Sequence, residues 1–420
     1  MSTNAIGTGI MFLHSPSIHV CFRARLTQDF SDEQYRAAAI AVQRRHPVLR
    51  RVIARGKDGY CFAKGGKVSL EFPADADWKA WYARTDAIPF DFEHGPLLKI
   101  AVLRGNGGAD LVLLGHHILG DGLGFLNLLR DFLAALNGTL PGEAQELPED
   151  NTLKKKPDLQ LKLTAALVNR KWRQHPTLFT REDALALFRD YRAQNPAGMF
   201  LAEESEEWLQ ALRRRCKAEG LTVNEAIARA FVRALQQQNG GQPVRLGCAC
   251  SLRGNMRTPV DGAMGNFVSG VSAKVSSCEE TPAVLRGKLS GNLPAVGLQM
   301  LHLLDPGLVA AVPFAAYGSF RNWAAQQVAE GAREGTADRS FGLSNLGAQP
   351  LGALSFGVEG VWFIPPAFPQ SYLVCGVLSC GGGIRFCLRY LEHVLTAAQA
   401  EEIYRSAAAA LAEESPESLK

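Results

Sequence analysis

The stretch LLGHHILGDGLGFLNLLRDFL, residues 113–133, joins an apolar strand-like run to a leucine-rich helix through a few polar residues. Two adjacent histidines, His116 and His117, end the apolar run, and Asp121 follows four residues after them. Burying polar side chains without partners costs free energy, so their place between two apolar elements needs an explanation. Three explanations compete: catalysis, metal binding and a purely structural turn.

The turn contains the residue types that general base catalysis needs. A histidine with a pKa near 6.5 is largely neutral at pH 7 and accepts a proton from an alcohol or an amine. Gly120 and Gly122 allow tight or positive-φ backbone angles that would fix the imidazole. One histidine would serve as the base, while the other and Asp121 would hold the turn. Ordinary hydrogen-bonded turn residues are the alternative.

Metal binding and the other common catalytic motifs have little support. Adjacent residues of a strand point to opposite faces, and a metal site would need His-x-x-x-His spacing or a third ligand. The sequence has no Gly-x-Ser-x-Gly elbow, P-loop or Gly-x-Gly-x-x-Gly fingerprint. The nine cysteines are scattered and form no CxxC pair, which favours buried free thiols over a zinc ribbon or disulfides.

Composition indicates a globular protein with two domains. A chain of 420 residues fits two domains of about 200 residues each. Apolar residues make up 47% and charged residues 20%, and the net charge of +4 excludes a histone-like nucleic-acid binder. The first seventeen residues do not resemble a secretion signal, and no apolar run reaches the roughly 18 residues of a membrane helix. We therefore expect a cytoplasmic protein, with no integral membrane segment, that acts as a monomer.

Hydrophobic periodicity predicts strands and helices mixed along two similar halves. Capping boxes at Ser31 with Gln34 and at Thr222 with Glu225 mark two helix starts, and Thr396 marks a third. We expect an α/β (α+β) fold with mixed sheets, in which residues 1–150 form a first lobe, 151–195 a linker and crossover, and 196–420 a second lobe. The predicted strands cover residues 17–26, 111–115, 244–250, 266–275, 341–346, 354–364, 372–379 and 384–390, and the predicted helices cover 31–45, 122–136, 204–219, 222–238 and a segment from 396.

Seven segments carry a resemblance to a known family. HHILGDG, residues 116–122, matches the HHxxxDG signature of the acyltransferase superfamily of chloramphenicol acetyltransferase and condensation domains. RRHPVLRRVI (44–53) and PFDFEHGPLLKIAVL (89–103) resemble the condensation-domain segments RHxxLRTxF and PFDLxxGPLLR, in the same order. LTVNEAIARAFVRAL, SLRGNMR, MGNFVSGVSAKV and FGLSNLG are similar to second-lobe segments of the stand-alone condensation-like and alcohol acyltransferase branch.

The resemblance implies a fold and a reaction. Two chloramphenicol-acetyltransferase-like lobes would form a pseudo-dimer with a tunnel at their interface. An acyl group would pass from a thioester, acyl-CoA or acyl carrier protein, to a small alcohol or amine acceptor. No other cofactor and no metal is implied. The motif's second histidine, His117, would act as general base beside His116.

The resemblance also assigns roles to residues around the base. Asp121 would point away from the tunnel and form an ion pair with Arg50, or with Arg45 or Arg51. Gly122 would keep the start of the following helix close to the strand. Ser344 or Asn345 of the FGLSNLG segment would supply a hydrogen bond to the oxyanion.

Some features limit the resemblance, and other functions stay open. The LTxxQ opening of condensation domains and the DFGWG motif of plant BAHD enzymes are missing. The basic runs KKK (154–156) and RRRCK (213–217) could meet coenzyme A phosphates or an acidic carrier protein, or else form solvated surface. One alternative is a catalytically silent fold that binds a carrier protein or partner. Another is a metal-dependent hydrolase using His116, His117 and Asp121.

Overall fold

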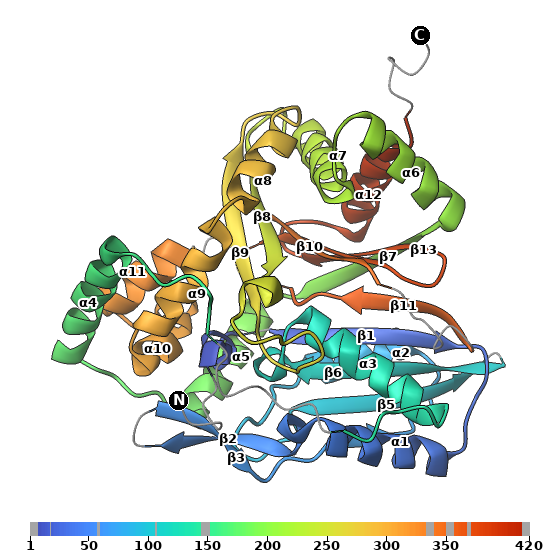
Figure 1. Ribbon diagram of the computed structural model, residues 1–420, viewed down its shortest axis with the longest axis horizontal. Helices are drawn as coiled ribbons and strands as arrows, with labels where there is room; N and C mark the ends of the chain where they lie inside the picture. The colour runs from blue at the N-terminus through green and yellow to red at the C-terminus, as the bar shows by residue number, and fades with distance from the viewer. Residues whose placement is uncertain are drawn as a thin grey trace.

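Two mixed β-sheets form the centre of the protein, and helices cover their outer faces (Figure 1). The structure is a computed structural model that describes residues 7–16, 18–56, 59–105, 107–143, 152–332, 340–349, 357–367 and 371–413. The α/β class with mixed sheets that the sequence predicts is confirmed, because each sheet combines parallel and antiparallel pairs.

The first sheet has five strands in the order β11-β1-β6-β5-β4. Only β4 and β5 pair in parallel. Strand β11 comes from the segment assigned to the second lobe, yet it pairs with β1, so both halves of the chain build this sheet. The strands are β1 (His19–Leu26), β4 (Ser69–Glu71), β5 (Leu98–Gly105), β6 (Gly108–His116) and β11 (Val358–Ile364), and a separate hairpin joins β2 (Arg51–Gly56) and β3 (Gly59–Lys64).

The second sheet has six strands in the order β7-β13-β12-β10-β8-β9. Strand β10 runs parallel to both β8 and β12, and the other pairs are antiparallel. The strands are β7 (Ala197–Ser205), β8 (Val244–Ser251), β9 (Val268–Val275), β10 (Ser340–Ala348), β12 (Leu373–Ser379) and β13 (Gly383–Leu391).

Apolar side chains on alternate strand positions hold the helices to the sheets. Helices α1 and α3 share one buried cluster with one face of the first sheet, and α2 packs on the other face together with β7 and β13. Helices α6, α7 and α12 cover the second sheet. These helices are α1 (Asp32–Arg45), α2 (Trp78–Asp86), α3 (Gly122–Leu136), α6 (Glu206–Ala218), α7 (Val223–Gln238) and α12 (Ala397–Ala412).

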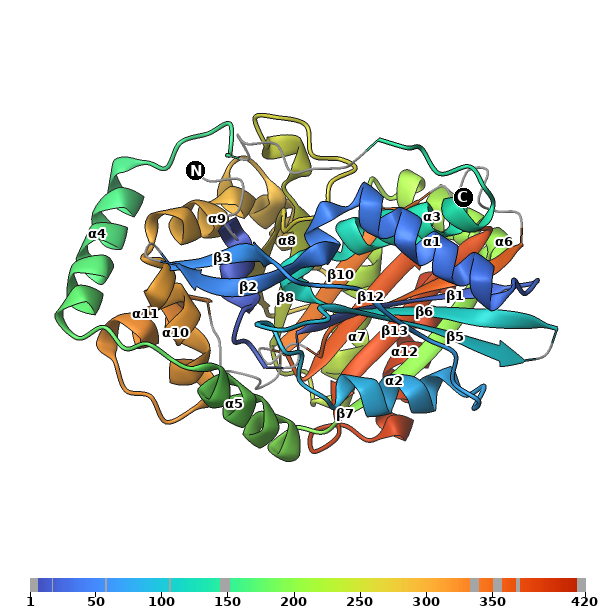
Figure 2. The same ribbon diagram turned by 90° about the horizontal axis from the view of Figure 1, so that it is seen from below.

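A further group of helices lies at one end of the molecule, where α4 forms the outer edge in two perpendicular views (Figures 1 and 2). Helices α4 and α5 occupy the segment expected to be linker and crossover. Among the described residues, no single helix is long and apolar enough to span a membrane, and only α9 and α10 taken together, bent by 110°, reach that length and composition. The helices of this group are α4 (Leu159–Gln174), α5 (Arg181–Gln194), α9 (Leu293–Leu303), α10 (Pro306–Tyr317) and α11 (Trp323–Ala332). Helix α8 (Thr281–Leu289) packs instead beside α7 and β9 in the cluster of the second sheet.

The helix starts predicted from capping residues are confirmed. Ser31 and Thr222 each form a complete capping box with the residue three positions later, and Thr396 does the same with Gln399. Each box satisfies two backbone N–H groups that the first turn leaves without partners. The described residues leave out Ser17 of the first predicted strand, residues 144–151 at the predicted lobe boundary and residues 354–356 of another predicted strand. The lobe boundaries stay predictions.

Candidate active site

The two motif histidines lie where β6 passes into a short 3₁₀ turn, η3 (His117–Leu119). The backbone N–H of His117 donates to the carbonyl of Ile18 on the neighbouring chain segment, at 3.2 Å. Nδ1 of His116 accepts from the N–H of Ile118 at 3.1 Å, so this side chain caps the turn. The turn ends the strand and places both imidazoles at its end.

The two imidazoles lie on opposite faces of the first sheet, as the alternation of strand side chains predicts. The ring of His116 lies near those of His19 and Phe90, with centroids 6.3 Å and 5.9 Å away. The ring of His117 stacks on Phe12 instead, at 4.0 Å and 29°. The two histidines therefore have separate surroundings.

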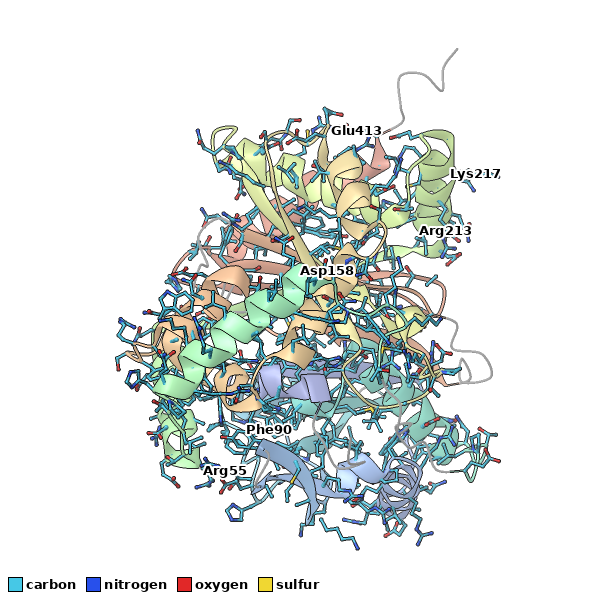
Figure 3. The ribbon with its side chains drawn as sticks, turned by 60° about the vertical axis from the view of Figure 1, so that its left-hand side comes forward. Arg55, Phe90, Asp158, Arg213, Lys217 and Glu413 are labelled. Carbon is cyan, nitrogen blue, oxygen red and sulfur yellow. The ribbon has the colours of Figure 1, made fainter. Side chains whose placement is uncertain are left out.

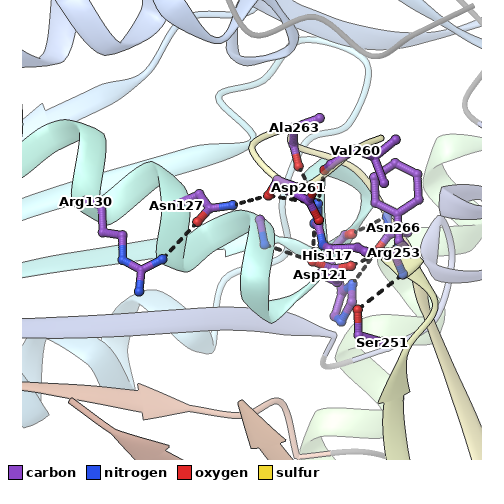
Figure 4. A network of polar contacts seen from close by, with 12 residues as sticks. His117, Asp121, Asn127, Arg130, Ser251, Arg253, Val260, Asp261, Ala263 and Asn266 are labelled. Atoms are coloured by element: carbon purple, nitrogen blue, oxygen red, sulfur yellow. Dashed lines mark hydrogen bonds and ion pairs between the residues drawn. The ribbon is translucent and has the colours of Figure 1, made fainter. Parts of the chain in front are cut away.

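Asn266 fixes the orientation and the tautomer of His117 (Figure 4). Its Nδ2 donates to the backbone carbonyl of His117 at 2.9 Å, which turns Oδ1 of Asn266 toward the ring. Oδ1 lies 2.9 Å from Nδ1 of His117 and can only accept, so Nδ1 carries the proton. The other ring nitrogen, Nε2, keeps its lone pair and is the basic atom. Asn266 lies in the MGNF segment, to which the sequence assigned no catalytic role.

The surroundings of His117 keep its imidazole neutral. Burial lowers the pKa of His117 below its ordinary value of 6.5, although the nearby charge of Asp121 and the hydrogen bond with Asn266 oppose this effect. Burial also lowers the pKa of His116, and the neighbouring histidines add to that effect. A neutral imidazole with a free Nε2 is the form that accepts a proton.

The ion-pair partner predicted for Asp121 is wrong. Nη2 of Arg253 donates to Oδ1 of Asp121 at 2.8 Å, and both side chains are buried. Oδ1 also accepts from the N–H of Gly124, and Oδ2 from the N–H of Phe267, at 2.8 Å and 2.9 Å. Arg50 is exposed at the end of a 3₁₀ turn, η2 (Pro47–Arg50), so it does not reach this buried carboxylate.

The other two arginines proposed as partners also lie elsewhere. Nε of Arg45 donates to Oδ2 of Asp131 in α3 at 2.6 Å, and Nε2 of His46 lies 2.7 Å from the same oxygen. Arg51 begins strand β2. The RRHP segment therefore connects the end of α1 to Asp131 of α3, which lies ten residues after Asp121 in the sequence.

The glycines of the motif allow close approach, and neither of them adopts the left-handed backbone conformation. Gly120 has a φ of 169°, which is extended backbone. A Cβ at this position would lie 3.1 Å from the backbone nitrogen of Gly265. A Cβ at Gly122 would lie 2.9 Å from Cδ2 of Leu346 on β10. The missing side chains let the second half of the chain contact the turn.

Strand β10 brings the two proposed oxyanion donors to different faces of the second sheet. The amide of Asn345 donates to Oδ1 of Asn224 on α7 at 3.2 Å, so Asn345 points toward the helices. Ser344 lies on the opposite face, which it shares with Leu346 because strand side chains alternate. Since Leu346 packs beside Gly122, this face is directed toward the first lobe.

The described residues contain no group of three or more His, Cys, Asp or Glu side chains arranged to hold a metal ion. His116 and His117 point to opposite faces, and Asp121 is engaged by Arg253 and two backbone N–H groups. The nine cysteines are free. Of the predicted site residues, the structure brings together His117 and Asp121, and it adds Asn266 and Arg253 from far along the chain.

The two mixed sheets and the histidine at the end of β6 agree with the chloramphenicol-acetyltransferase-like acyltransferase superfamily that the sequence resembles. Within this superfamily, residues 10–284 match the family model of the condensation domain, and the chain belongs to the condensation-domain family. No curated protein sequence gives a significant match.

Several solved structures share the fold over nearly the whole chain. Trichothecene 15-O-acetyltransferase from Fusarium sporotrichioides aligns with a TM-score of 0.64 and 11% identity, covering 97% of this chain and 94% of that one. The condensation domain of the monacolin K polyketide synthase gives 0.63 and 14%, covering 97% and 96%. Polyketide synthase associated protein 5 from Mycobacterium tuberculosis gives 0.59 and 14%, covering 99% and 100%. These similarities confirm the predicted two-lobed fold.

Proposed function

We propose that this protein transfers an acyl group from a thioester to an alcohol or an amine, with His117 as the general base. The observation that carries the proposal is the hydrogen bond between Nδ1 of His117 and Asn266, which leaves Nε2 as the basic atom. Burial supports the proposal, because it keeps the imidazole neutral near pH 7. Membership of the condensation-domain family supports the reaction class.

The proposed reaction needs one proton shuttle. Nε2 of His117 takes the proton of the acceptor hydroxyl or amine while the acceptor oxygen or nitrogen attacks the thioester carbonyl carbon. The carbon–sulfur bond then breaks, and the departing thiolate takes the proton back from the imidazolium. The free thiol and the ester or amide leave, so His117 ends the cycle neutral.

Ser344 is the better of the two proposed oxyanion donors. Both ends of the Asn345 amide already have partners, since Nδ2 donates to Asn224 and Oδ1 accepts from the N–H of Gly347. Ser344 shares the opposite strand face with Leu346, on the side toward Gly122. A hydroxyl aimed at the developing negative charge would stabilise the tetrahedral intermediate.

The donor would be an acyl thioester of coenzyme A or of a carrier protein. One structural relative is an O-acetyltransferase, and others are a condensation domain of a polyketide synthase and a polyketide synthase associated protein. These relatives support both a hydroxyl acceptor and a carrier-bound donor for this chain.

Thiol release tests the proposed function directly. The wild type and His117→Ala are incubated with a panel of acyl-CoA thioesters and with mixed alcohols and amines. We expect thiol release that requires an acceptor and falls by roughly 10²–10⁴-fold in His117→Ala, the usual worth of a positioned general base. The same assay with acyl carrier protein as donor completes the panel. Full activity of His117→Ala, or silence with both donor types, would contradict the proposal.

A further inference from the structure

Helix α4 has two apolar faces, and only one of them packs against the protein. The inner face is held by the neighbouring helices α9 and α11, and Asn169 on this face donates to the carbonyl of Leu303 at 2.8 Å. Leu159, Leu163 and Leu167 recur every fourth residue and so form one stripe on the outer face. Their exposed fractions are 70%, 62% and 44%, which is unusual for three neighbouring leucines on one face of a helix.

Positive charge surrounds the leucine stripe. The only acidic residue from 152 to 175 is Asp158, which caps the helix by accepting from the N–H of Leu161 at 2.8 Å. In this part of the described chain, no basic side chain forms an ion pair, although Lys154 donates to the carbonyl of Gly254. The basic residues, all exposed, are Lys154, Lys155, Lys156, Lys162, Arg170, Lys171 and Arg173.

An exposed tryptophan lies beside the C-terminal end of α4. Asn322, directly before α11, donates to the carbonyl of His175 at the end of α4, at 3.2 Å. Trp323 begins α11 next to this contact and is 48% exposed. Tryptophan is enriched where proteins meet the polar–apolar boundary of a lipid bilayer. Figure 3 shows α4 running across the outside of the molecule from Asp158, with no element over its outer face.

The other basic run of the sequence, in α6, differs from α4 in the pairing of its charges and in the exposure of its leucines. In α6, Arg213 pairs with Glu206 at 3.9 Å, and Arg215 donates to the backbone carbonyl of Glu413 at 2.9 Å. The two leucines of this helix, Leu209 and Leu212, are buried in the cluster of the second sheet. Figure 3 shows Arg213 and Lys217 on a separate part of the surface from α4. Helix α6 is therefore a basic surface without exposed leucines.

We propose that the outer face of α4 binds the surface of a membrane that contains anionic lipids. An amphipathic helix at such a surface inserts its apolar stripe at the headgroup boundary while lysines and arginines contact anionic headgroups. Leu159, Leu163 and Leu167 would supply the stripe, and the surrounding basic residues would supply the charge. The proposal does not depend on the acyl-transfer reaction.

Charge and shape favour a lipid surface over the other possible occupants. A second copy of the chain would place one excess of positive charge against another, which opposes association. The outer face of a single helix is convex, so a protein partner would need a matching groove, whereas a lipid interface adapts to a ridge. The exposed Trp323, beside the end of the same helix, also fits the bilayer boundary.

Vesicle co-sedimentation of the full chain tests the proposal. Vesicles of phosphatidylcholine with phosphatidylglycerol are compared with vesicles of phosphatidylcholine alone. We expect binding to the anionic vesicles that weakens as salt rises. Combined Lys155→Gln, Lys156→Gln and Lys162→Gln should weaken binding about fivefold for each charge removed. Combined Leu159→Ser, Leu163→Ser and Leu167→Ser should weaken it by about tenfold or more.

The matched control replaces Arg213, Arg214 and Lys217 on α6 by glutamine, which removes the same charge from the basic surface without leucines. This control should bind vesicles like the wild type. All substituted residues are exposed except Arg213, which is half-buried, and unchanged melting temperatures verify folding of each variant. Absence of vesicle binding, or equal loss in the α6 control, would overturn the proposal. So would a wild-type dimer that the leucine variant dissociates in light scattering, or binding to an acidic carrier protein without binding to vesicles.

Discussion

The two faces of strand β6 carry two polar clusters that contain similar residue types. They differ in whether a histidine nitrogen is left available to accept a proton. The His117 cluster consists of His117, Asp121, Arg253 and Asn266. The His116 cluster consists of His19, Asp86, His116, Arg192 and Arg389. Each contains a buried aspartate that binds an arginine from the second half of the chain.

The aspartate of the His116 cluster joins three parts of the protein. Oδ1 of Asp86, the last residue of α2, lies 2.9 Å from Nδ1 of His19 on β1. Its Oδ2 accepts from Arg192 of α5 at 2.9 Å and lies 3.4 Å from Nη2 of Arg389 on β13. Burial alone would raise the pKa of Asp86, but the hydrogen bond from His19 and the two arginines hold it below the ordinary value.

The difference between the clusters lies in the free ring nitrogen of one histidine. In the His117 cluster, Asn266 occupies Nδ1 and the aspartate binds Arg253 and the backbone, so Nε2 of His117 stays available. In the His116 cluster, the carboxylate itself binds a histidine, His19, and Nδ1 of His116 caps the turn. One cluster therefore suits proton transfer and the other suits holding the two halves together.

Matched substitutions of the adjacent histidines give the largest expected contrast. In the thiol-release assay, His117→Asn should lower kcat by roughly 10²–10⁴-fold, because asparagine cannot take the acceptor's proton. His116→Asn keeps an oxygen acceptor for the turn and should change kcat per folded molecule by only a few-fold. Similar losses in the two variants would remove the functional distinction between the faces.

The two aspartates should separate stability from activity. Asp121→Ala and Asp86→Ala each leave a buried arginine without its carboxylate, so each should lower the free energy of unfolding by about 3–5 kcal/mol. Only Asp121→Ala should also lower kcat, since it frees the turn that holds His117. Urea unfolding combined with thiol release below the unfolding range measures both effects. A loss of kcat in Asp86→Ala would place both clusters in the reaction.

Acid should weaken both faces of β6, because each holds a histidine that burial keeps neutral. Burial lowers the pKa of His14 to about 3 and also lowers the pKa values of His116 and His117. Between pH 6.5 and the folded pKa, the unfolded state binds more protons, so stability falls as pH falls. Each such histidine should cost about 1.4 kcal/mol per pH unit below 6.5.

Urea titrations at several pH values between about 7 and 5 measure this slope. His14→Phe keeps an aromatic ring in a pocket that includes Tyr60 and Phe92 but removes one titrating group. The variant should therefore lose less stability on acidification than the wild type. An unchanged slope would mean that His14 is not kept neutral by burial.

Local patterns in the sequence were sufficient for the elements that frame the site. Strand alternation placed His116 and His117 on opposite faces, and the capping residues marked three helix starts. Helices α4 and α5 were missed because the charged residues and prolines before and between them are also typical of an exposed linker. No local pattern predicts that β11, from the second half of the chain, pairs with β1 in the first sheet, because strand pairing depends on residues far apart in the sequence.

The partners of the site residues could not be read from the sequence for a related reason. Arg253 and Asn266 lie 132 and 149 residues from the side chains that they bind, Asp121 and His117. Their segments, SLRGN and MGNF, resembled the family, but a resemblance identifies a segment without stating which side chain meets which. Arg50 was chosen for Asp121 because it occupies the matching position of the family segment, whereas the buried contact comes from the other half of the chain.

The smallest expected effect on the free energy of unfolding comes from replacing Arg50, the predicted partner of Asp121. Replacing Arg253, the observed partner, should have a large effect. Arg50→Ala changes an exposed side chain and should alter the free energy of unfolding by no more than about 0.5 kcal/mol. Arg253→Ala removes the donor to Asp121 and the donor to the carbonyl of Ala263, so its cost should match that of Asp121→Ala. In the double variant Asp121→Ala with Arg253→Ala, the cost should fall well short of the sum, because neither charge is left without its partner. Coupling of this kind between Asp121 and Arg50 would instead show that the sequence-based pairing forms in solution.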